Sequence, residues 1–326
     1  MKTTIVLGLM ASGSGVVHDY LSSRKDFESP FGPNEFKLCA DPLGLHYLYI
    51  NCYKNFSFFN PSHVMDEFLN YSDRLQQFNV YEKHNKPKKL YKKNFDNISK
   101  EFIKKITDTS YYANPEFSNF KINSFESFVL KLKKSRYNFF NVRLPVNEKK
   151  FIDESKKYIK KIILNNLERK KLKKNANVVL NQAINIFDPI SSSQYFEKKK
   201  IVIVMRDPRD IFASMKHRKS KGTPHQNVHI FIKWFKRCFE SNYFNKNLKH
   251  KDILIINFES FVNNFDRENK RLCKFLNINK KFQLKKNYFN FFNLEFSKKN
   301  LYKSKFNLTN DEFLLIKKKL KKFLLW

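Results

Sequence analysis

The sequence predicts an α/β protein in which helices cover a mostly parallel β-sheet. Four short runs rich in β-branched residues are apolar throughout, as is typical of strands buried on both faces; they cover residues 3–8, 177–182, 201–206 and 252–258. Between and after these runs, apolar residues recur at the i, i+3, i+4 spacing of helices with one buried face. A glycine-rich segment follows the first run directly, which is typical of a sharp turn from a strand into a helix.

The helical pattern is clearest in three places. The apolar stripes consist of Ile159, Ile162, Ile163 and Leu167, then Val228, Phe231, Phe235, Cys238 and Phe239, and then Leu272, Phe275 and Leu276. A last helix is indicated by the capping-box spacing of Thr309 and Glu312, followed by the apolar residues Phe313, Ile316, Leu320 and Phe323. We expect these stripes to face the core.

Residues 51–150 interrupt this alternation of strands and helices. They are rich in aromatic residues, lysine and asparagine, as in residues 83–95, and carry few strand signals. We interpret residues 51–170 as a helical insertion within a single domain that spans residues 1–326.

The composition predicts a large core and an anionic partner. The 326 residues are 41% hydrophobic and 16% aromatic, which argues against a disordered protein. Lys and Arg number 64 against 30 Asp and Glu, giving a formal charge of +34. This charge favours nucleic acid, a charged glycan, a phospholipid surface or a nucleotide as partner. Because lysine is spread through nearly every segment, a general lysine bias also explains the charge.

The four cysteines indicate neither a zinc site nor a disulfide framework. Cys39, Cys52, Cys238 and Cys273 form no C-x-x-C pair and no cluster with histidine, which fits the reducing cytoplasm. The N-terminal apolar run, about six residues long, is short for a signal peptide, and no stretch approaches the roughly 18 apolar residues of a membrane span. We therefore expect a cytoplasmic protein without a membrane span.

The segment GLMASGSG, residues 8–15, has the chemistry of a phosphate-binding loop. A strand that turns into a helix through glycines directs backbone N–H groups and the positive end of the helix dipole at an anion. A Walker A loop would end in G-K-[ST], but Ser14 stands at the lysine position, which disfavours hydrolysis of ATP or GTP. A dinucleotide-binding G-x-G-x-x-G would need a glycine at His18. An ordinary tight turn remains the alternative interpretation.

The segment IVIVMRDPRDIFASM places a second set of phosphate-binding groups at the end of a strand. Arg206 ends the buried strand, and Asp207 is an N-cap for the helix that follows. Ser214 lies roughly 9 Å further along this helix, so the arginine and the serine can meet on one phosphate. Alternatively, an Arg206–Asp210 or Arg209–Asp207 ion pair stabilises the turn.

Together, the two motifs resemble the sulfotransferase family, whose members use 3′-phosphoadenosine 5′-phosphosulfate (PAPS) as the donor. Residues 253–264 and 271–278 are similar to a later strand and helix of the family, and residues 297–305 are similar to a segment that closes over the nucleotide in bacterial members. The resemblance implies a P-loop-NTPase-like three-layer α/β/α sandwich with a central, mostly parallel sheet and a helical insertion.

The resemblance also implies which residues hold the donor. In the family, a loop ending in S-G-[ST] binds the 5′-phosphosulfate, and a strand-end arginine and a serine eight positions further on bind the 3′-phosphate. The implied nucleotide-binding residues are Ala11, Ser12, Gly13, Ser14, Gly15 and Val16 in the loop, Arg206 and Ser214 in the second motif, and Ser297, Lys298 and Lys299 near the C-terminus.

Two positions depart from the family's pattern. Members usually carry a lysine or arginine directly before S-G, where this chain has Ala11, and they often carry a glycine where Tyr302 stands. Either Lys37, Lys298 or Lys299 supplies the missing loop charge, or this member is slow or inactive.

In the sulfotransferase family, a histidine or a glutamate is the base that deprotonates the acceptor. In the carbohydrate sulfotransferases of the heparan type, this glutamate lies on the second strand. The segment FGPNEFKLCADP occupies that place, which makes Glu35 the implied catalytic base. Alternatively, Glu35 is a solvated residue that pairs with Lys37 or Arg24.

Four further polar residues are candidates for the acceptor side of the site. Asp41 is a second candidate base, and His18 is a third, with a structural role as its alternative. Asn181 and Gln182 lie at the end of a predicted strand, where other members have an active-site residue. Their amides cannot act as bases, but they can orient a substrate hydroxyl.

We therefore expect an enzyme that transfers a sulfuryl group from PAPS to a hydroxyl or amine of an acceptor, with a sugar or glycan implied by Glu35. The reaction requires deprotonation of the acceptor and stabilisation of charge on the leaving phosphate, and it requires no metal. The insertion is expected to form a lid over the acceptor site. The alternatives are a P-loop kinase or NTPase, which predicts magnesium-dependent ATP binding, and a basic nucleic-acid-binding protein, which predicts strongly salt-dependent affinity. No nucleic-acid-binding module is recognisable, so no nucleic-acid partner is expected.

Overall fold

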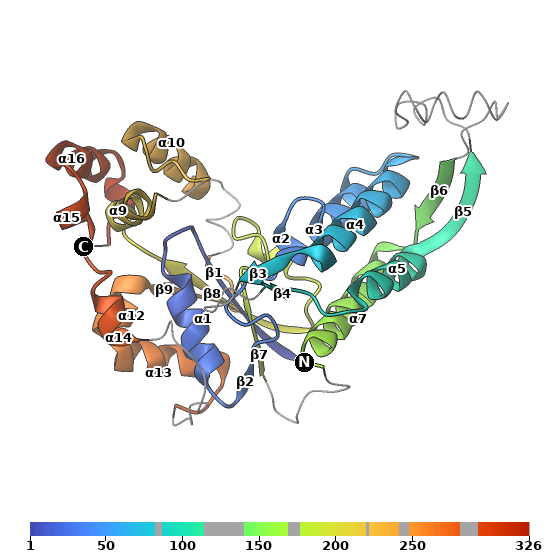
Figure 1. Ribbon diagram of the computed structural model, residues 1–326, viewed down its shortest axis with the longest axis horizontal. Helices are drawn as coiled ribbons and strands as arrows, with labels where there is room; N and C mark the ends of the chain where they lie inside the picture. The colour runs from blue at the N-terminus through green and yellow to red at the C-terminus, as the bar shows by residue number, and fades with distance from the viewer. Residues whose placement is uncertain are drawn as a thin grey trace. The chain divides into compact units, whose positions relative to one another are not determined.

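The structure is a computed structural model that describes residues 1–81, 87–113, 140–168, 177–219, 222–240, 248–280 and 293–325. The chain divides into two compact units, one formed by Met1–Ala40 with Ile163–Trp326 and the other by Asp41–Ile162. Figure 1 shows the helices and strands of each unit.

A five-stranded parallel sheet forms the centre of the first unit (Figure 1). Ile5 pairs with Leu180 on one side and with Ile201 on the other, and all three side chains are buried. Such central positions favour apolar, β-branched residues, because both faces of the sheet are covered. In spatial order the strands are β2 (Phe27–Glu28), β7 (Asn177–Asn181), β1 (Lys2–Gly8), β8 (Lys198–Met205) and β9 (Ile253–Asn257).

All four predicted strands are present, with ends at most three residues from the expected ones. The short edge strand β2 was not predicted, because two residues are too few for a hydrophobic pattern. Numbered along the chain, the strands lie in the order 2-3-1-4-5, and the order reverses at β1. Together with the flanking helices, this topology confirms the predicted P-loop-NTPase-like α/β fold. Open parallel sheets bind ligands beyond the carboxyl ends of the strands at such a point.

Helices and short helical turns connect and flank these strands. The predicted apolar stripes of residues 228–239 and 272–276 lie on α10 and α13, and Phe231, Phe235 and Leu272 are buried as expected. The helical elements of the first unit are α1 (Ser14–Ser23), α2 (Lys37–Ala40), α8 (Pro189–Ser192), α9 (Pro208–Arg218), α10 (Val228–Phe239), α12 (Phe258–Asn263), α13 (Phe265–Leu276), α14 (Leu294–Lys298), α15 (Ser304–Asn307), α16 (Asn310–Lys319) and the 3₁₀ turn η3 (Lys321–Phe323).

One apolar cluster joins the sheet to α1, α12 and α13. Burial of this apolar surface, at about 25 cal/mol for each Å², is the main force that holds the helices on the sheet. The cluster consists of Val6, Val17, Tyr20, Leu21, Phe27, Val179, Val202, Val204, Ile256, Phe258, Phe261, Val262, Leu272, Leu276 and Leu301.

The predicted capping box begins the last helix, α16. The backbone N–H of Glu312 donates to Oγ1 of Thr309 over 3.3 Å, and the backbone N–H of Thr309 donates to Oε2 of Glu312 over 2.9 Å. Both Oε atoms of Glu312 also accept hydrogen bonds from Lys216 of α9, at 2.7 and 2.8 Å. The capping residue therefore also connects α16 to the helix that carries Ser214.

The second unit contains strands as well as helices. Two antiparallel pairs, β3 with β4 and β5 with β6, lie where the sequence predicted helical structure. β4 reads Pro-Lys-Lys and most of β5 is exposed, so neither carries the apolar pattern of a strand. β6 reads Phe-Asn-Val-Arg-Leu-Pro, an alternating apolar pattern that the sequence analysis missed. The elements are α3 (Leu45–Tyr49), the π-helical turn η1 (Ile50–Lys54), α4 (Asn60–Gln77), β3 (Asn79–Tyr81), β4 (Pro87–Lys89), α5 (Phe95–Ile106), β5 (Thr107–Ala113), β6 (Phe140–Pro145) and α7 (Glu148–Asn166), whose end belongs to the first unit.

Aromatic packing between α5 and α7 stabilises the second unit. The ring of Phe102 stacks on that of Tyr158 with centroids 4.3 Å apart, and the Tyr158 hydroxyl lies 2.7 Å from that of Ser99. The apolar stripe predicted for residues 159–167 continues this contact, since Ile159 and Ile162 are buried. Within the described helices, none combines the length and apolar character that a membrane crossing needs.

Candidate functional site

A cavity of about 530 Å³ lies in the first unit, within the size range of small-molecule sites. Three segments form most of its wall: the loop after β1 with the start of α1, the two arginines at either end of α9 (Arg206 just before it and Arg218 in its last turn), and the segment after residue 293. Of the residues implied by the sequence, the cavity is lined by Ala11, Gly13, Ser14, Gly15, Val16, Arg206 and Ser297. Ser12, Ser214, Lys298 and Lys299, which the resemblance also implied, are not among the residues that line it.

The loop between β1 and α1 has a backbone that favours glycine at two positions. Gly13 has a φ of 86° and precedes the first residue of α1, while Ala11 has a φ of 63°. A Cβ at Gly13 would lie 2.3 Å from a ring carbon of Phe258, so this position excludes larger residues for steric reasons as well. The N–H of Val16 donates to the carbonyl of Gly13 over 3.0 Å. The N–H groups of Ser14 and Gly15, at the start of α1, have no preceding helical turn to bind and are therefore available to an anion.

Gln182 holds this loop through its side-chain amide. Its Oε1 accepts from the backbone N–H of Gly8 over 3.3 Å, and its Nε2 donates to the carbonyl of Gly8 over 2.8 Å and to Oγ of Ser14 over 3.3 Å. The amide of the neighbouring Asn181 donates to the carbonyl of Pro33 over 3.2 Å. In the structure, both amides therefore bind the protein itself.

Arg206 joins the three segments of the wall. Its Nη1 donates to the carbonyl of Ala11 over 2.8 Å and to Oγ of Ser214 over 3.0 Å, and its Nη2 donates to the carbonyl of Asn300. The guanidinium lies 4.9 Å from the ring centre of Phe258. Burial lowers the pKa of Arg206, and its Nε has no hydrogen-bond partner among the described residues. A buried cation with an unused donor is suited to bind an anion.

The alternative interpretation of this motif is also partly correct. Arg209 and Asp207 form a buried ion pair in which Nε and Nη2 each lie 2.9 Å from a carboxylate oxygen. Asp210, in contrast, accepts from the backbone N–H groups of Tyr302 and Ser304, over 3.1 and 2.9 Å. Asp210 therefore binds the C-terminal segment to α9.

The C-terminal segment contributes one of its three implied residues to the cavity. Ser297 is 1% exposed, and its hydroxyl has no partner among the described residues. Lys298 is exposed and pairs with Glu295 over 2.7 Å, and Lys299 is exposed as well; neither lines the cavity. Tyr302, at the position where the family often has glycine, adopts a φ of 53°.

Glu35 lies outside the wall of this cavity. Its side chain is 52% exposed, and its Oε2 accepts from Nζ of Lys37 over 3.3 Å, which is the solvated pairing named as the alternative. Glu35 belongs to no full strand, but it forms a single parallel bridge with Asn181, at the carboxyl end of β7. Arg24 instead binds both carboxylate oxygens of Asp26, at 2.9 and 2.8 Å.

The two other candidate bases have partners inside the protein. Asp41 belongs to the second unit and accepts from the hydroxyl of Tyr71 over 2.9 Å. His18 is buried, with Nδ1 3.2 Å from Oδ1 of Asp19 and Nε2 3.4 Å from the hydroxyl of Ser22. His18 therefore has the structural role that the sequence offered as its alternative.

Several residues of the cavity wall were not predicted. Asp19, Pro33, Arg218, Phe258, Phe296 and Asn300 line it. Only Arg218 carried a usable signal, because it follows Ser214 by four positions and therefore lies on the same side of α9. Phe258 and Asn300 reach the site through tertiary packing, which no local pattern encodes.

Glu259 is a buried carboxyl group next to the Arg206 segment. Its Oε1 accepts from the backbone N–H of Asp207 over 3.0 Å, while its Oε2 has no partner among the described residues. Burial raises the pKa of Glu259 to about 7, and the nearby Arg206 opposes this shift.

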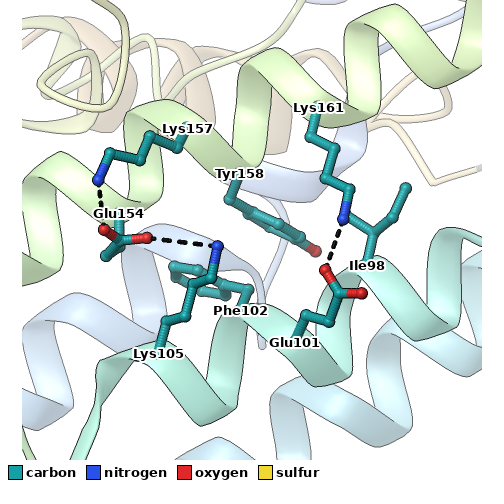
Figure 2. A pocket seen from close by; sticks show the side chains of 8 residues that line it. All are labelled: Ile98, Glu101, Phe102, Lys105, Glu154, Lys157, Tyr158 and Lys161. Atoms are coloured by element: carbon teal, nitrogen blue, oxygen red, sulfur yellow. Dashed lines mark hydrogen bonds and ion pairs between the residues drawn. The ribbon is translucent and has the colours of Figure 1, made fainter.

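The second unit has a smaller hollow of about 50 Å³ between α5 and α7. Figure 2 shows that its charged side chains pair with one another. Lys161 of α7 pairs with Glu101 of α5 at 2.5 Å and Glu154 of α7 with Lys105 of α5 at 4.0 Å, while Lys157 pairs with Glu154 on the same helix at 2.6 Å. Because water and salt screen exposed charges, such pairs contribute little to stability. The hollow has room for little more than water. Within the described ranges, no three His, Cys, Asp or Glu residues gather as a metal site would require.

Comparison with known proteins gives a family for this chain. Residues 4–282 match the model of the sulfotransferase family, a match that spans most of the chain. No curated protein sequence matches.

Three solved structures are among those that align with the chain. A sulfotransferase from Alicyclobacillus acidocaldarius has 11% identity and a TM-score of 0.37, with 94% of each chain covered. Sulfotransferase STF1 from Mycobacterium tuberculosis H37Rv has 10% identity and a TM-score of 0.39, covering 92% of this chain and 76% of that one. A retinol dehydratase in complex with androsterone and inactive cofactor PAP has 12% identity and a TM-score of 0.31, covering 100% and 82%. The family assignment rests on the match over residues 4–282.

Replacement of Gly13 by alanine is expected to destabilise the protein by about 3 kcal/mol. The substitution forces a side chain into the left-handed region and drives Cβ into the ring of Phe258. Gly15→Ala is the matched control, because a Cβ there meets no atom within 4 Å. Urea unfolding measures both free energies, and equal values for the two variants would contradict this account of the loop.

Glu259→Gln is expected to remove part of the pH dependence of stability. Because the folded-state pKa, about 7, exceeds the unfolded value of 4.5, the wild type loses stability as pH rises between these values. The loss is on the order of 3 kcal/mol. The glutamine variant lacks this titration, so its stability relative to wild type should increase from pH 4.5 to 7.5. The exposed control Glu295→Gln should show no such trend, and a constant Glu259→Gln difference over this range would refute the assignment.

Proposed function

The chain belongs to the sulfotransferase family and is therefore an enzyme of sulfuryl transfer, and from this premise we propose that its donor is PAPS. The residues present fit such a nucleotide. The loop after β1 offers N–H groups at the start of α1, and Arg206, which lines the same cavity and donates to the buried Ser214, offers a second anion site. The two sites would hold the 5′-phosphosulfate and the 3′-phosphate, respectively.

The observation that carries this proposal is the hydrogen bond of 3.0 Å from Arg206 to Ser214. The serine oxygen accepts this bond, so its own proton remains for an anionic oxygen. Nε of Arg206 is buried without a partner and can donate to the same anion. A loop that served only as a turn would not need a second set of unused donors nearby.

When bound, the donor PAPS would supply an activated sulfuryl group. The protein must stabilise the negative charge that develops on the leaving phosphate, and preorganised N–H donors do so effectively away from bulk water. We assign this task to the first turn of α1, while the guanidinium of Arg206 holds the loop in place through its hydrogen bond to the carbonyl of Ala11. Lys37 and Lys298, named as substitutes for the missing loop cation, pair with Glu35 and Glu295 instead.

Glu35 remains the proposed base for the acceptor. Support comes from its place in the sequence and from its bridge to Asn181 at the carboxyl end of β7. As a base, the Glu35 carboxylate would take the proton from the acceptor hydroxyl while the new S–O bond forms. This role requires the carboxylate to give up its hydrogen bond from Lys37.

We propose a sugar or glycan as the acceptor. The proposal rests on the resemblance of the Glu35 segment to carbohydrate sulfotransferases and on the charge of +34, which suits an anionic polymer. We also propose that residues 51–170 form an insertion within a single catalytic domain. In this proposal the insertion covers the bound acceptor.

We further propose that the enzyme acts in the cytoplasm. All four cysteines are free, and Cys39, Cys52 and Cys273 are buried. Burial raises the pKa of Cys52 to about 12 and that of Cys238 to about 11. Because only the thiolate is reactive, these protonated thiols are inert at neutral pH.

Calorimetric titration with adenosine 3′,5′-bisphosphate tests the donor. We expect micromolar binding, much weaker binding of adenosine 5′-monophosphate, and no preference for ATP with magnesium. Ser214→Ala should weaken binding of the bisphosphate about tenfold and leave the monophosphate unchanged, because it removes a charge-assisted hydrogen bond. Arg206→Ala is less informative, since Arg206 also binds Ala11 and Asn300. Tighter binding of ATP with magnesium, or of no nucleotide, would overturn the proposal.

Glu35→Gln tests the base. If Glu35 deprotonates the acceptor, the variant should bind adenosine 3′,5′-bisphosphate normally but transfer sulfate at least about a hundredfold more slowly. Turnover is measured with labelled PAPS and a panel of glycan acceptors, with Glu295→Gln as the exposed-glutamate control. Unchanged turnover in Glu35→Gln would remove this residue from the mechanism while leaving the donor site intact.

A further inference from the structure

The end of the described chain carries a surface of lysines and exposed apolar side chains. Residues 313–325 contain five lysines and no acidic residue. Leu314 of α16 is 49% exposed and lies three and four positions before Lys317 and Lys318, so these side chains share the outer face of the helix. We call this surface the C-terminal patch; it consists of Leu314, Lys317, Lys318, Lys319, Lys321 and Leu325, all of them exposed.

The opposite face of α16 is packed against the rest of the first unit. Ile316 and Leu320 are fully buried, and the ring of Phe323 in η3 lies 5.4 Å from that of Phe235 in α10. Figure 1 shows α16 next to α9 and α10. The patch is therefore the outward side of a helix that is held in place.

The positive charge of the patch is not neutralised by neighbouring carboxylates. Within the described part of the chain, four of the five lysines form no hydrogen bond or ion pair, and the fifth, Lys322, pairs with Glu240 over 3.1 Å. In α7, by contrast, Lys156, Lys157 and Lys161 all pair with acidic residues. A general lysine bias explains the lysines of both helices, but it does not explain why residues 313–325 lack acidic residues.

Exposed apolar side chains distinguish between classes of anionic partner. Leu314 and Leu325 are 49% and 37% exposed, and Phe306 in the preceding α15 is 84% exposed. Nucleic acids contact basic proteins mainly through their phosphate groups, which gain little from an exposed leucine. An anionic bilayer offers charged head groups to lysine and, directly beneath them, apolar chains to leucine and phenylalanine. The combination therefore favours a phospholipid surface.

We propose that the C-terminal patch binds the surface of an anionic phospholipid bilayer. In this role the lysines contact the head groups at the end of their flexible apolar stems, while Leu314 and Leu325 enter the boundary between head groups and acyl chains. Ile316 and Leu320 keep α16 packed on the protein, so the protein binds peripherally. Because the patch shares no residue with the cavity wall, this binding is independent of the donor and acceptor proposed above.

A purely structural role for the lysines makes a different prediction. Cations in the last turn of a helix interact favourably with the helix dipole, and Lys317, Lys318 and Lys319 lie in the last turn of α16. If this were their only role, replacing them would lower the melting temperature, and the wild type would not bind vesicles.

The test is co-sedimentation of the full chain with vesicles of phosphatidylcholine alone or of equal parts phosphatidylcholine and phosphatidylglycerol. We expect binding to the mixed vesicles, little binding to phosphatidylcholine alone, and loss of binding at about 1 M salt, where the Debye length falls to roughly 3 Å. Replacing Lys317, Lys318 and Lys321 together by glutamine should weaken binding to mixed vesicles at least about tenfold. Leu314→Gln, which leaves the net charge unchanged, should weaken it about fivefold.

Helix α7 offers the matched control for charge. Lys149, Lys150 and Lys160 are exposed and form no ion pair within the described residues, so replacing all three by glutamine removes the same net charge elsewhere. This variant should bind mixed vesicles like the wild type. Replacing the three patch lysines by arginine keeps the charge and should preserve binding. Every variant should bind adenosine 3′,5′-bisphosphate like the wild type, which separates this test from that of the donor.

Each other outcome is decisive. A wild type that ignores mixed vesicles, or that binds pure phosphatidylcholine equally well, overturns the proposal. An equal loss in the α7 variant also overturns it, because binding would then follow net charge rather than the patch. Unchanged binding in Leu314→Gln would indicate a general polyanion site and contradict a bilayer partner. Melting temperatures show whether the glutamine triple variant keeps its fold; if it does not, Leu314→Gln and the arginine triple variant carry the comparison.

Discussion

The buried guanidinium of Arg206 connects the loop after β1, helix α9 and the segment around Asn300 through three hydrogen bonds. A charge at this depth is costly unless it is paired, and here its partners are a hydroxyl and two carbonyl oxygens rather than a carboxylate. The positive charge therefore stays available to a ligand, while the hydrogen bonds fix the geometry. The rest of the cavity depends on this contact, because the three connected segments form its wall.

Backbone conformation explains how the chain accommodates its departures from the family's loop pattern. Ala11 and Tyr302 both adopt positive φ values, 63° and 53°, which cost non-glycine residues on the order of 1 kcal/mol each. Each is held by hydrogen bonds: the carbonyl of Ala11 accepts from Arg206, and the N–H of Tyr302 donates to Asp210. The strain is therefore offset by the contacts that assemble the cavity.

The sequence predicted those features that depend on local pattern. Continuous apolar runs identified four of the five strands of the central sheet, and the spacing of Thr309 and Glu312 identified the capping box of α16. In the second unit, β4 and β5 were missed because they lack a buried apolar pattern, whereas the alternation of β6 was overlooked. Phe258 and Asn300 were missed because only tertiary packing brings them to the cavity. Local motifs therefore identify the loop after β1 and Arg206 at the end of β8, whereas the part of the cavity wall formed by Phe258, Phe296 and Asn300 has no local sequence signal.

We propose that Arg206 and Ser214 receive the second phosphate of the donor nucleotide. A crystal structure of the protein with adenosine 3′,5′-bisphosphate tests it most directly. We expect 3′-phosphate oxygens within hydrogen-bond distance of Nε of Arg206 and Oγ of Ser214, with the 5′-phosphate at the first turn of α1. A 3′-phosphate directed into solvent, or a nucleotide bound outside this cavity, would contradict it.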